Sequence, residues 1–555
     1  MMEATLSLVR EHAVLWPALL FALVTPIHLL RADRGRRSAQ FTQRESRNLV
    51  LAGAAAIALF VLSVALYLSS AALVDMWESV SGSVAALFLR GEPIYPDLST
   101  EQRYGSPYGP YLYIALGVSQ LLFGASAFAT KLPCVVAGLL AIALFGSVVY
   151  RRSGALGMAI VFAGFEAALL LVFRLQAFWP KADSLILLAV TIGLVAVLRT
   201  GLPWQLLLGF CLGIATGMKL HAAVYFLPLI PLAFSRGWTT RALIFAGIAG
   251  ASVTMLPFLV LPGQFSIANY LALLQMAAHE GFSFEAALRF LKWAAALAAL
   301  IAVGDRWQGR NEELTAQERR FRFRYRLAVA IGLALAVVPG AAIGAGPRHL
   351  MPFVPLALFD FSSHFCKATV LTAGRDRPFW RLLAYSAFAA SLLAAIATTG
   401  RVFELRRSAN APLLALQAEI RRVLNSYRDA TILMGAGDDD NLAVPLARQE
   451  LVFAGHPIGI DTACMMDYRR AARPEPDLPK LAAELRARDD RPLVWIVPHG
   501  EPFSISNIYD GQPVFSDEFR QSFRDAFEIA ERTAFFDLYV AKEDAHARAS
   551  VARAD

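Results

Sequence analysis

Two acidic side chains stand where a long apolar segment, residues 48–74, ends: Asp75, and Glu78 one helical turn later. Acids at the mouth of a membrane helix rarely serve packing, because a carboxylate is costly to remove from water. Partial dehydration disfavours the charged form of a carboxylate and so makes it a better proton acceptor. We therefore expect Asp75 to act as a general base that takes the proton of an acceptor hydroxyl, with Glu78 beside it.

Further polar residues could complete a site around these acids. Fixed cations stabilise negative charge on a bound or departing group, and Asp183 could bind the acceptor or orient one of the cations. The predicted site has a catalytic set of Asp75, Glu78 and Asp183, an anion-binding set of Lys219, His221, Arg348 and His349, which the resemblance described below assigns to a donor phosphate, and a substrate-binding set of Tyr95, Tyr104, Tyr108 and Lys181.

Each of these residues also has a structural explanation. Asp183 could cap a helix that starts at Ser184, and Arg348 could be a snorkelling anchor. Most of the loop tyrosines could belong to the aromatic belt of a membrane interface. The acidic run 438–440 fits a solvated turn better than a metal site. We expect no metal and no cofactor, although the sequence leaves a divalent ion open.

The composition is that of a membrane protein. Of the 555 residues, 57% are hydrophobic and only 17% are charged, and the mean hydropathy is +0.49. A soluble chain of this size would not have so large a hydrophobic fraction. Apolar runs recur along the chain from residues 12–30 to residues 382–399. Because roughly twenty apolar residues span a bilayer, these runs predict about twelve membrane crossings. The four cysteines provide neither a disulfide framework nor metal-ligand spacing.

The arginine-rich connections orient these crossings. Arginine and lysine concentrate in cytoplasmic loops, which places residues 31–47, 306–326 and 367–381 inside. The remaining connections agree only if the apolar piece 110–124 does not cross, so we expect it to be an interfacial or re-entrant helix. Both termini and all the predicted site residues then lie outside. The net charge of +8 lies mostly in the inner loops and requires no nucleic acid.

The chain divides into three expected parts. Residues 1–47 form an extra first span and its cytoplasmic loop, and residues 48–400 form the transmembrane core, with an outer loop at 75–127. Residues 401–555 have a mixed composition typical of a soluble α/β domain, with buried strands expected at 431–434, 493–497 and 536–540. The predicted fold is therefore a mainly α, polytopic transmembrane bundle with an outer α/β domain.

The order of motifs in this chain resembles the GT-C superfamily of integral-membrane glycosyltransferases. The resemblance covers roughly residues 48–400. It consists of Asp75 at the end of a span, the segment Gly91-Glu92-Pro93-Ile94-Tyr95, the Tyr/Pro-rich piece 104–113, Pro180-Lys181-Ala182-Asp183, Gly217-Met218-Lys219 and Pro347-Arg348-His349-Leu350-Met351-Pro352. Trp77 between the two acids departs from the Asp-Glu pair of the protein mannosyltransferases, and the Lys-Pro-Pro element of the aminoarabinose transferases is absent.

This resemblance implies a glycosyltransferase in a bacterial inner membrane. It would move a sugar from a polyprenyl-phosphate donor to a lipid, glycan or protein acceptor on the periplasmic face. One carboxylate base without a partner nucleophile favours direct displacement with inversion at the sugar.

Two other classes stay open. A secondary transporter is suggested by Glu166 near the middle of one apolar run and Asp360 within another, because intramembrane acids often mark proton or substrate paths. No inverted repeat supports it, and most polar groups gather on one side. The second class is a polytopic receptor or scaffold. Such a protein would keep its function when all the acidic residues on the outer side were neutralised.

Overall fold

The computed structural model describes residues 43–71, 73, 76–308, 315–368, 377–438, 443–508 and 510–542. The predicted span 12–30 lies outside these residues, as do Asp75 and part of each of the basic loops 31–47, 306–326 and 367–381.

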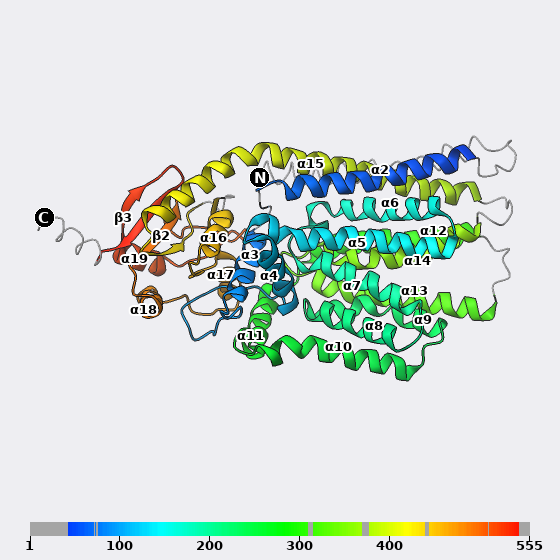
Figure 1. Cartoon of the computed structure of the whole chain (residues 1–555), viewed down its shortest axis with the longest axis horizontal. Coiled ribbons are helices and arrows are strands. Elements are labelled where there is room, and N and C mark those ends of the chain that lie inside the picture. The colour runs from blue at the N-terminus through cyan, green and yellow to red at the C-terminus, as the bar shows by residue number, and fades with distance from the viewer. Residues whose placement is uncertain are drawn as a thin grey trace, which may run out of the picture.

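The largest part of the described chain is a bundle of roughly parallel helices (Figure 1). It comprises α2 (Gln43–Leu68), α5 (Ala127–Ser153), α6 (Leu156–Val172), α7 (Ala182–Val197), α8 (Leu202–Thr216), α9 (Leu229–Ser235), α10 (Thr240–Val260), α12 (Phe284–Gln308), α13 (Ala316–Gly340), α14 (Val354–Ala368) and the first half of α15 (Arg377–Ser426). Within the described ranges four helical stretches are long and apolar enough to cross a membrane: Arg47–Leu68, Ala127–Ser153, Thr240–Val260 and Tyr385–Ala409. Further helical stretches of the described residues are apolar but shorter, such as Leu156–Val172 and Ala182–Val197.

Small residues let neighbouring helices of the bundle approach closely. A Cβ on Gly164 of α6 would come 2.3 Å from the carbonyl oxygen of Gly53 in α2. Lipid tails are as apolar as leucine, so helices in a membrane associate through such close packing and through hydrogen bonds. A hydrogen bond joins α2 to another helix: Ser63 of α2 and Thr399 of α15 share a buried hydrogen bond of 2.8 Å.

Short 3₁₀ segments interrupt the bundle at several points: η1 (Arg174–Ala177), η2 (Leu220–Phe226), η3 (Ala278–Glu280) and η4 (Pro347–Phe353). Proline explains part of this pattern, since it removes a backbone donor and ends or kinks a helix. Pro228 follows η2, and Pro347 opens η4. These breaks expose backbone and side chains inside the bundle, where a continuous helix would present only its surface.

Three short helices lie between the bundle and the C-terminal sheet: α3 (Met76–Leu89), α4 (Pro110–Phe123) and α11 (Ile267–Ala277) (Figure 1). Helix α4 is the segment predicted not to cross. It begins after Gly109 with proline at its first position and ends at Gly124 with φ of +80°. Its last turn exposes Leu121, Leu122 and Phe123, as expected for a helix whose tip meets lipid.

The C-terminal part contains a four-stranded sheet in the order β1-β2-β4-β3. Its strands are β1 (Thr431–Met434), β2 (Leu493–Pro498), β3 (Phe527–Arg532) and β4 (Phe536–Ala541), with β1 and β2 parallel and the other pairs antiparallel. Helices α16 (Ala443–Phe453), α17 (Thr462–Arg470), α18 (Leu478–Arg488) and α19 (Asp517–Ala526) surround it. Strands therefore occupy all three segments predicted to form them, and β3 is additional. Trp495, fully buried on β2, packs edge-on against Phe503 and Phe523, each with its ring centroid 5.7 Å away.

Helix α15 joins the bundle to the sheet without a break. It runs for 50 residues and passes through residue 400, where the change in composition suggested a domain boundary. Its second half carries Leu413, Leu416, Ile420 and Val423, which are buried in one cluster with residues of β1, β2 and β4. These residues recur at helical spacing, so they form one apolar face of α15, and that face packs on the sheet.

Candidate active site

An ionic cluster lies where three helix breaks meet. Asp183 is in the first turn of α7, Lys219 immediately precedes η2, and Arg348 is in η4. Lys219 Nζ donates to Asp183 Oδ1 at 2.6 Å, and Arg348 Nε lies 3.7 Å from Asp183 Oδ2. The side chains of Asp183, Lys219 and Arg348 are 2%, 6% and 11% exposed. Charges this deeply buried are stable only when paired, so the geometry of this cluster is tightly constrained.

Two histidines and a tyrosine border the ionic cluster. His221 Nε2 and His349 Nδ1 share a hydrogen bond of 3.2 Å, and the Tyr225 hydroxyl lies 3.5 Å from the same Nδ1. Two imidazoles joined in this way require that one donates and the other accepts. His221 and Tyr225 are four residues apart in η2, and His349 comes from η4, so the same two breaks supply both the cations and the imidazoles.

Aromatic rings form another side of the site. Lys181 Nζ lies 3.7 Å from the ring centroid of Trp179, and the Arg348 guanidinium lies 5.4 Å from it. Lys219 Nζ lies 5.3 Å from the ring centroid of Tyr108 in the outer loop. The buried indole Nε1 of Trp179 has no hydrogen-bond partner among the described residues, which makes it a free donor at the edge of the cation cluster.

Glu78 lies in a second buried polar group, where α3 meets the end of α2. The Tyr67 hydroxyl donates to Glu78 Oε2 at 2.8 Å. Lys131 Nζ donates to the backbone carbonyls of Tyr67 at 3.3 Å and Ser70 at 2.9 Å, and lies 4.3 Å from the Tyr67 ring centroid. Glu78 and Lys131 are both 0% exposed. The structure thus places this acid beside a buried cation instead of on a solvated helix end.

The two polar groups are close to each other. The Cys134 thiol of α5 donates to the Lys181 carbonyl at 3.3 Å, and it lies within electrostatic reach of both Asp183 and Glu78. The segment that carries Asp75 connects α2 to α3, the two helices that hold the Tyr67 and Glu78 side chains. Asp75 itself lies outside the described residues, so its role as the base stays a prediction.

Comparison with solved structures identifies the arrangement of the helices. The apo crystal structure of ArnT from Cupriavidus metallidurans matches with a TM-score of 0.53 at 14% identity, covering 87% of this chain and 97% of that one. The ArnT structure bound to undecaprenyl phosphate matches with a TM-score of 0.51 at 14% identity, covering 88% and 97%. ArnT is a GT-C glycosyltransferase. The chain has the GT-C fold.

A weaker likeness is to the arabinosyltransferase EmbB from Mycobacterium smegmatis, with a TM-score of 0.38 at 14% identity, covering 85% of this chain and 46% of that one. No family model and no curated protein matches the sequence. The two ArnT matches confirm, at the level of the fold, the GT-C resemblance drawn from the sequence motifs.

Within this GT-C fold, three of the motifs meet at one place. Lys181 and Asp183, Lys219 and His221, and Arg348 and His349 are far apart in the sequence but adjacent in the structure. The sequence analysis missed Trp179, Tyr225 and Tyr67. The first is two residues before Lys181, and the second is one helical turn after His221, so spacing could have suggested both. No local signal marks Tyr67.

The predicted loop tyrosines have different surroundings. Tyr108 faces Lys219, as described above. The Tyr95 hydroxyl donates to the Tyr108 carbonyl at 2.9 Å, and the Tyr104 hydroxyl donates to the Pro93 carbonyl at 2.7 Å. Burial raises the pKa of both Tyr95 and Tyr104 above the usual range. Their hydroxyls therefore stabilise the loop, and the structure does not bring them to the ionic cluster.

Two further acids lie away from this site. Glu166, in α6, is fully buried, and neither of its carboxyl oxygens has a hydrogen-bond partner among the described residues. Asp360, in α14, pairs with Arg326 of α13 at 3.2 Å. Within the described ranges no group of three or more His, Cys, Asp and Glu side chains is placed to hold a metal ion. Metal independence stays a prediction.

Proposed function

We propose that this protein is a membrane glycosyltransferase that moves a sugar from a polyprenyl-phosphate donor to the hydroxyl of a lipid, glycan or protein acceptor. The buried Lys219–Asp183–Arg348 cluster carries this proposal, because it places two cations where three helix breaks open the bundle. Fixed cations in a dry site bind phosphate and stabilise charge that develops on it. The GT-C fold adds support, since one of the similar structures is bound to undecaprenyl phosphate.

The proposed topology has about twelve spans, with both termini and the site on the periplasmic side of a bacterial inner membrane. The positions of the arginines support this orientation. Arg151 and Arg152 end α5, and Arg199 follows α7, at the opposite end of those helices from Lys131 and Asp183. Cytoplasmic connections are enriched in such residues. The C-terminal sheet lies at the same end of the bundle as α3 and α4 (Figure 1).

The proposed reaction is a single displacement. The acceptor oxygen attacks the anomeric carbon while the bond from that carbon to the phosphate oxygen breaks, and the bonding electrons leave with the phosphate. Asp75 takes the acceptor proton, and Lys219 and Arg348 stabilise the departing polyprenyl phosphate. Asp183 holds both cations in position, and Glu78 helps to fix the acid pair at the end of α2. The product would have the inverted anomeric configuration.

The decisive experiment is transfer of labelled sugar from a panel of polyprenyl-phosphate donors by the purified protein in lipid. Asp75→Asn is assayed beside wild type, with Asp525→Asn as the control, because Asp525 is an exposed acid on α19. Transfer by wild type and by the control, but not by Asp75→Asn, establishes the reaction class and the base. Absence of transfer from every donor by folded wild-type protein would refute the proposal.

Secondary transport is the alternative, and Glu166 is the observation that favours it. A fully buried carboxyl group without a hydrogen-bond partner among the described residues is unusual and often functional. Solute or proton flux through proteoliposomes that is lost in Glu166→Gln and retained in Asp75→Asn would select transport over transfer.

A further inference from the structure

A segment of the outer loop connects the C-terminal part of the chain to the ionic cluster. We call residues 101–109 the strap. At its outer end the backbone of Arg103 pairs with the chain around Ile460: Arg103 N donates to Gly459 O at 2.9 Å, and Asp461 N donates to Arg103 O at 2.6 Å. Arg103 and Asp461 are buried, so these bonds are shielded from water.

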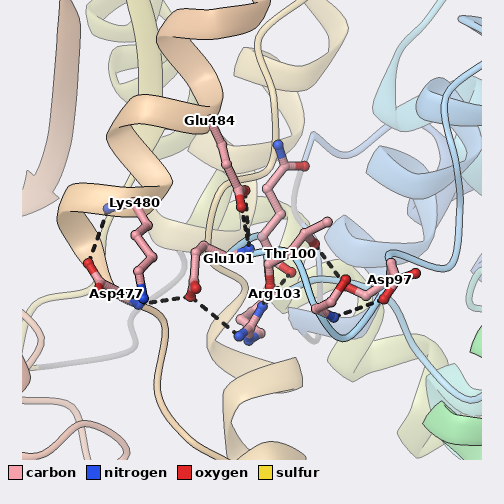
Figure 2. Close-up of polar contacts among 9 residues, drawn as sticks. Asp97, Thr100, Glu101, Arg103, Asp477, Lys480 and Glu484 are labelled. Atoms are coloured by element: carbon pink, nitrogen blue, oxygen red, sulfur yellow. Dashed lines mark hydrogen bonds and ion pairs between the residues drawn. The ribbon is translucent and has the colours of Figure 1, made fainter.

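Side chains strengthen this outer attachment (Figure 2). Glu101 N donates to both carboxylate oxygens of Glu484 in α18, at 3.2 and 3.1 Å, and Glu101 Oε2 accepts from Asp477 N at 2.9 Å. The Arg103 guanidinium lies 5.1 Å from the ring centroid of Tyr468 in α17. Hydrogen bonds to charged groups are stronger than neutral ones. The outer end of the strap is thus held by three separate segments of the C-terminal part.

At its inner end the strap is bound to the residues that precede Lys219. Gly109 N donates to Met218 O at 2.8 Å, and Tyr111 N lies 3.4 Å from Gly217 O. A Cβ on Gly109 would stand 2.2 Å from Gly217 O. The φ of Gly109 is −80°, which any residue adopts, so glycine is required here by space and not by backbone conformation.

The strap between these ends has internal support. The Tyr95 hydroxyl holds the Tyr108 carbonyl, and the hydroxyls of Ser106 and Tyr113 share a buried hydrogen bond of 2.7 Å. The ring of Tyr108 then faces Lys219. A short, internally bonded segment that is fixed at both ends transmits displacement from one end to the other, since packed interiors deform little.

We propose that the strap makes the position of Lys219 depend on the docking of residues 459–484, so that the C-terminal part of the chain is a positioning element of the site. Release of the outer attachment frees Tyr108 and the 217–219 backbone, and the Lys219 ammonium loses its fixed place. The expectation that release of the strap weakens phosphate binding rests on the proposed function. The mechanical connection between the two ends of the strap does not depend on that function.

The connection is tested by hydrogen exchange on the full-length protein in lipid nanodiscs. The outer attachment is weakened by Glu101→Ala with Glu484→Ala, which removes half-buried acids and leaves both cores intact. Glu531→Ala is the matched control, because Glu531 pairs with Arg422 at 2.8 Å in the same part of the chain and lies away from the strap. We expect the Gly109 and Tyr111 amides to exchange about tenfold faster in the double variant, as for loss of a charged hydrogen bond, and to be unchanged in the control.

Faster exchange confined to residues 97–104 and 476–485, with unchanged Gly109 and Tyr111 amides, would show that the two ends are independent and would overturn the proposal. Gly109→Ala tests the inner end alone. It should disturb exchange at 216–222, and an unaltered 216–222 segment also overturns the proposal.

Binding of undecaprenyl phosphate to the same variants separates this proposal from the proposed function. If wild type binds the lipid, both the double variant and Gly109→Ala should bind it at least several-fold more weakly. If wild type does not bind it, the proposed function fails, and the exchange measurements still decide whether the strap couples the two ends.

Discussion

Replacement of Lys219 by methionine should have two separable effects. The change leaves the Asp183 carboxylate, whose side chain is 2% exposed, without its partner at 2.6 Å. Removing one member of a buried ion pair costs about 3–5 kcal/mol of stability. Arg348 Nε remains 3.7 Å from the other carboxylate oxygen and offsets part of this loss. We therefore expect Lys219→Met to lower the free energy of unfolding by about 3 kcal/mol, the lower end of that range.

A second substitution distinguishes stability from function. Asp183→Asn in the Lys219→Met background removes the unpaired charge, so the double variant should recover stability to within about 1 kcal/mol of wild type. It should not recover binding of undecaprenyl phosphate. A hydrogen bond to a charged group is worth about 1.5–3 kcal/mol, which corresponds to a loss of about 10- to 150-fold in affinity.

The assays are denaturant unfolding in detergent micelles for stability and equilibrium binding of undecaprenyl phosphate in nanodiscs for affinity. Arg422→Met is the control, because this arginine is an exposed partner of Glu419 and Glu531. A double variant that binds the lipid as wild type does would refute the assignment of Lys219 to the phosphate. A Lys219→Met protein that is as stable as wild type would refute the claim that Lys219 and Asp183 form a buried ion pair shielded from water.

Four further outcomes are expected. Asp75→Asn should lower sugar transfer by about 10²- to 10⁴-fold in the labelled-donor assay, as for loss of a general base, whereas addition of a chelator should leave wild-type transfer unchanged. Glu166→Gln should retain transfer, and loss of transfer there would favour the transport alternative. Burial lowers the pKa of His456 to about 4 from 6.5, so the folded state holds this proton more weakly than the unfolded state. Unfolding curves should show full stability above about pH 6.5 and a decline toward pH 4, and His456→Asn should flatten that decline.

The parts of the site that sequence could predict are those attached to helix breaks. Pro180 before Asp183, Gly217 before Lys219 and Pro347 before Arg348 each mark a point where a membrane helix is interrupted. Polar side chains at such points face the interior of the bundle, because lipid would not tolerate them. The arginine-rich loops predict that these residues share one side of the membrane, and residues on one side of a bundle can converge on one site.

The surroundings of individual side chains could not be predicted. Nothing in the spacing distinguishes Tyr108, whose ring faces Lys219, from Tyr104, whose hydroxyl is held by a backbone carbonyl. Both are buried loop tyrosines, and which backbone group each hydroxyl meets depends on how the loop folds on its neighbours. The same holds for Glu78: its buried partner Tyr67 belongs to the preceding helix and carries no motif.

The C-terminal boundary shows a related limit. Composition changes near Gly400, although the apolar stretch that could cross a membrane continues to Ala409. The backbone of α15 continues across that point, since helix formation depends on local hydrogen bonds and on packing at each end. A change of environment is therefore not a break in structure, and α15 connects the two parts as a single rod.

The charges of the ionic cluster predict the charge of its ligand. Among the described residues, Lys219 and Arg348 share one carboxylate, Asp183, and the nearby His221 and His349 are hydrogen-bonded to each other. Lys181, beside the Trp179 ring that Arg348 also faces, is a third buried cation of the site. Positive charge is thus in excess among the described residues of the site, and a buried excess charge raises the free energy of the empty protein. An anion removes that cost when it binds. We therefore expect the site to prefer a polyprenyl phosphate to a neutral alcohol of the same chain length. Part of this preference comes from the high free energy of the empty site, and part comes from the contacts in the complex. In the proposed reaction the freed phosphate would carry more negative charge than it did in the donor, and the same excess of positive charge would favour it over the substrate. Release of the polyprenyl phosphate, and not the displacement, would then be the slow step of that reaction.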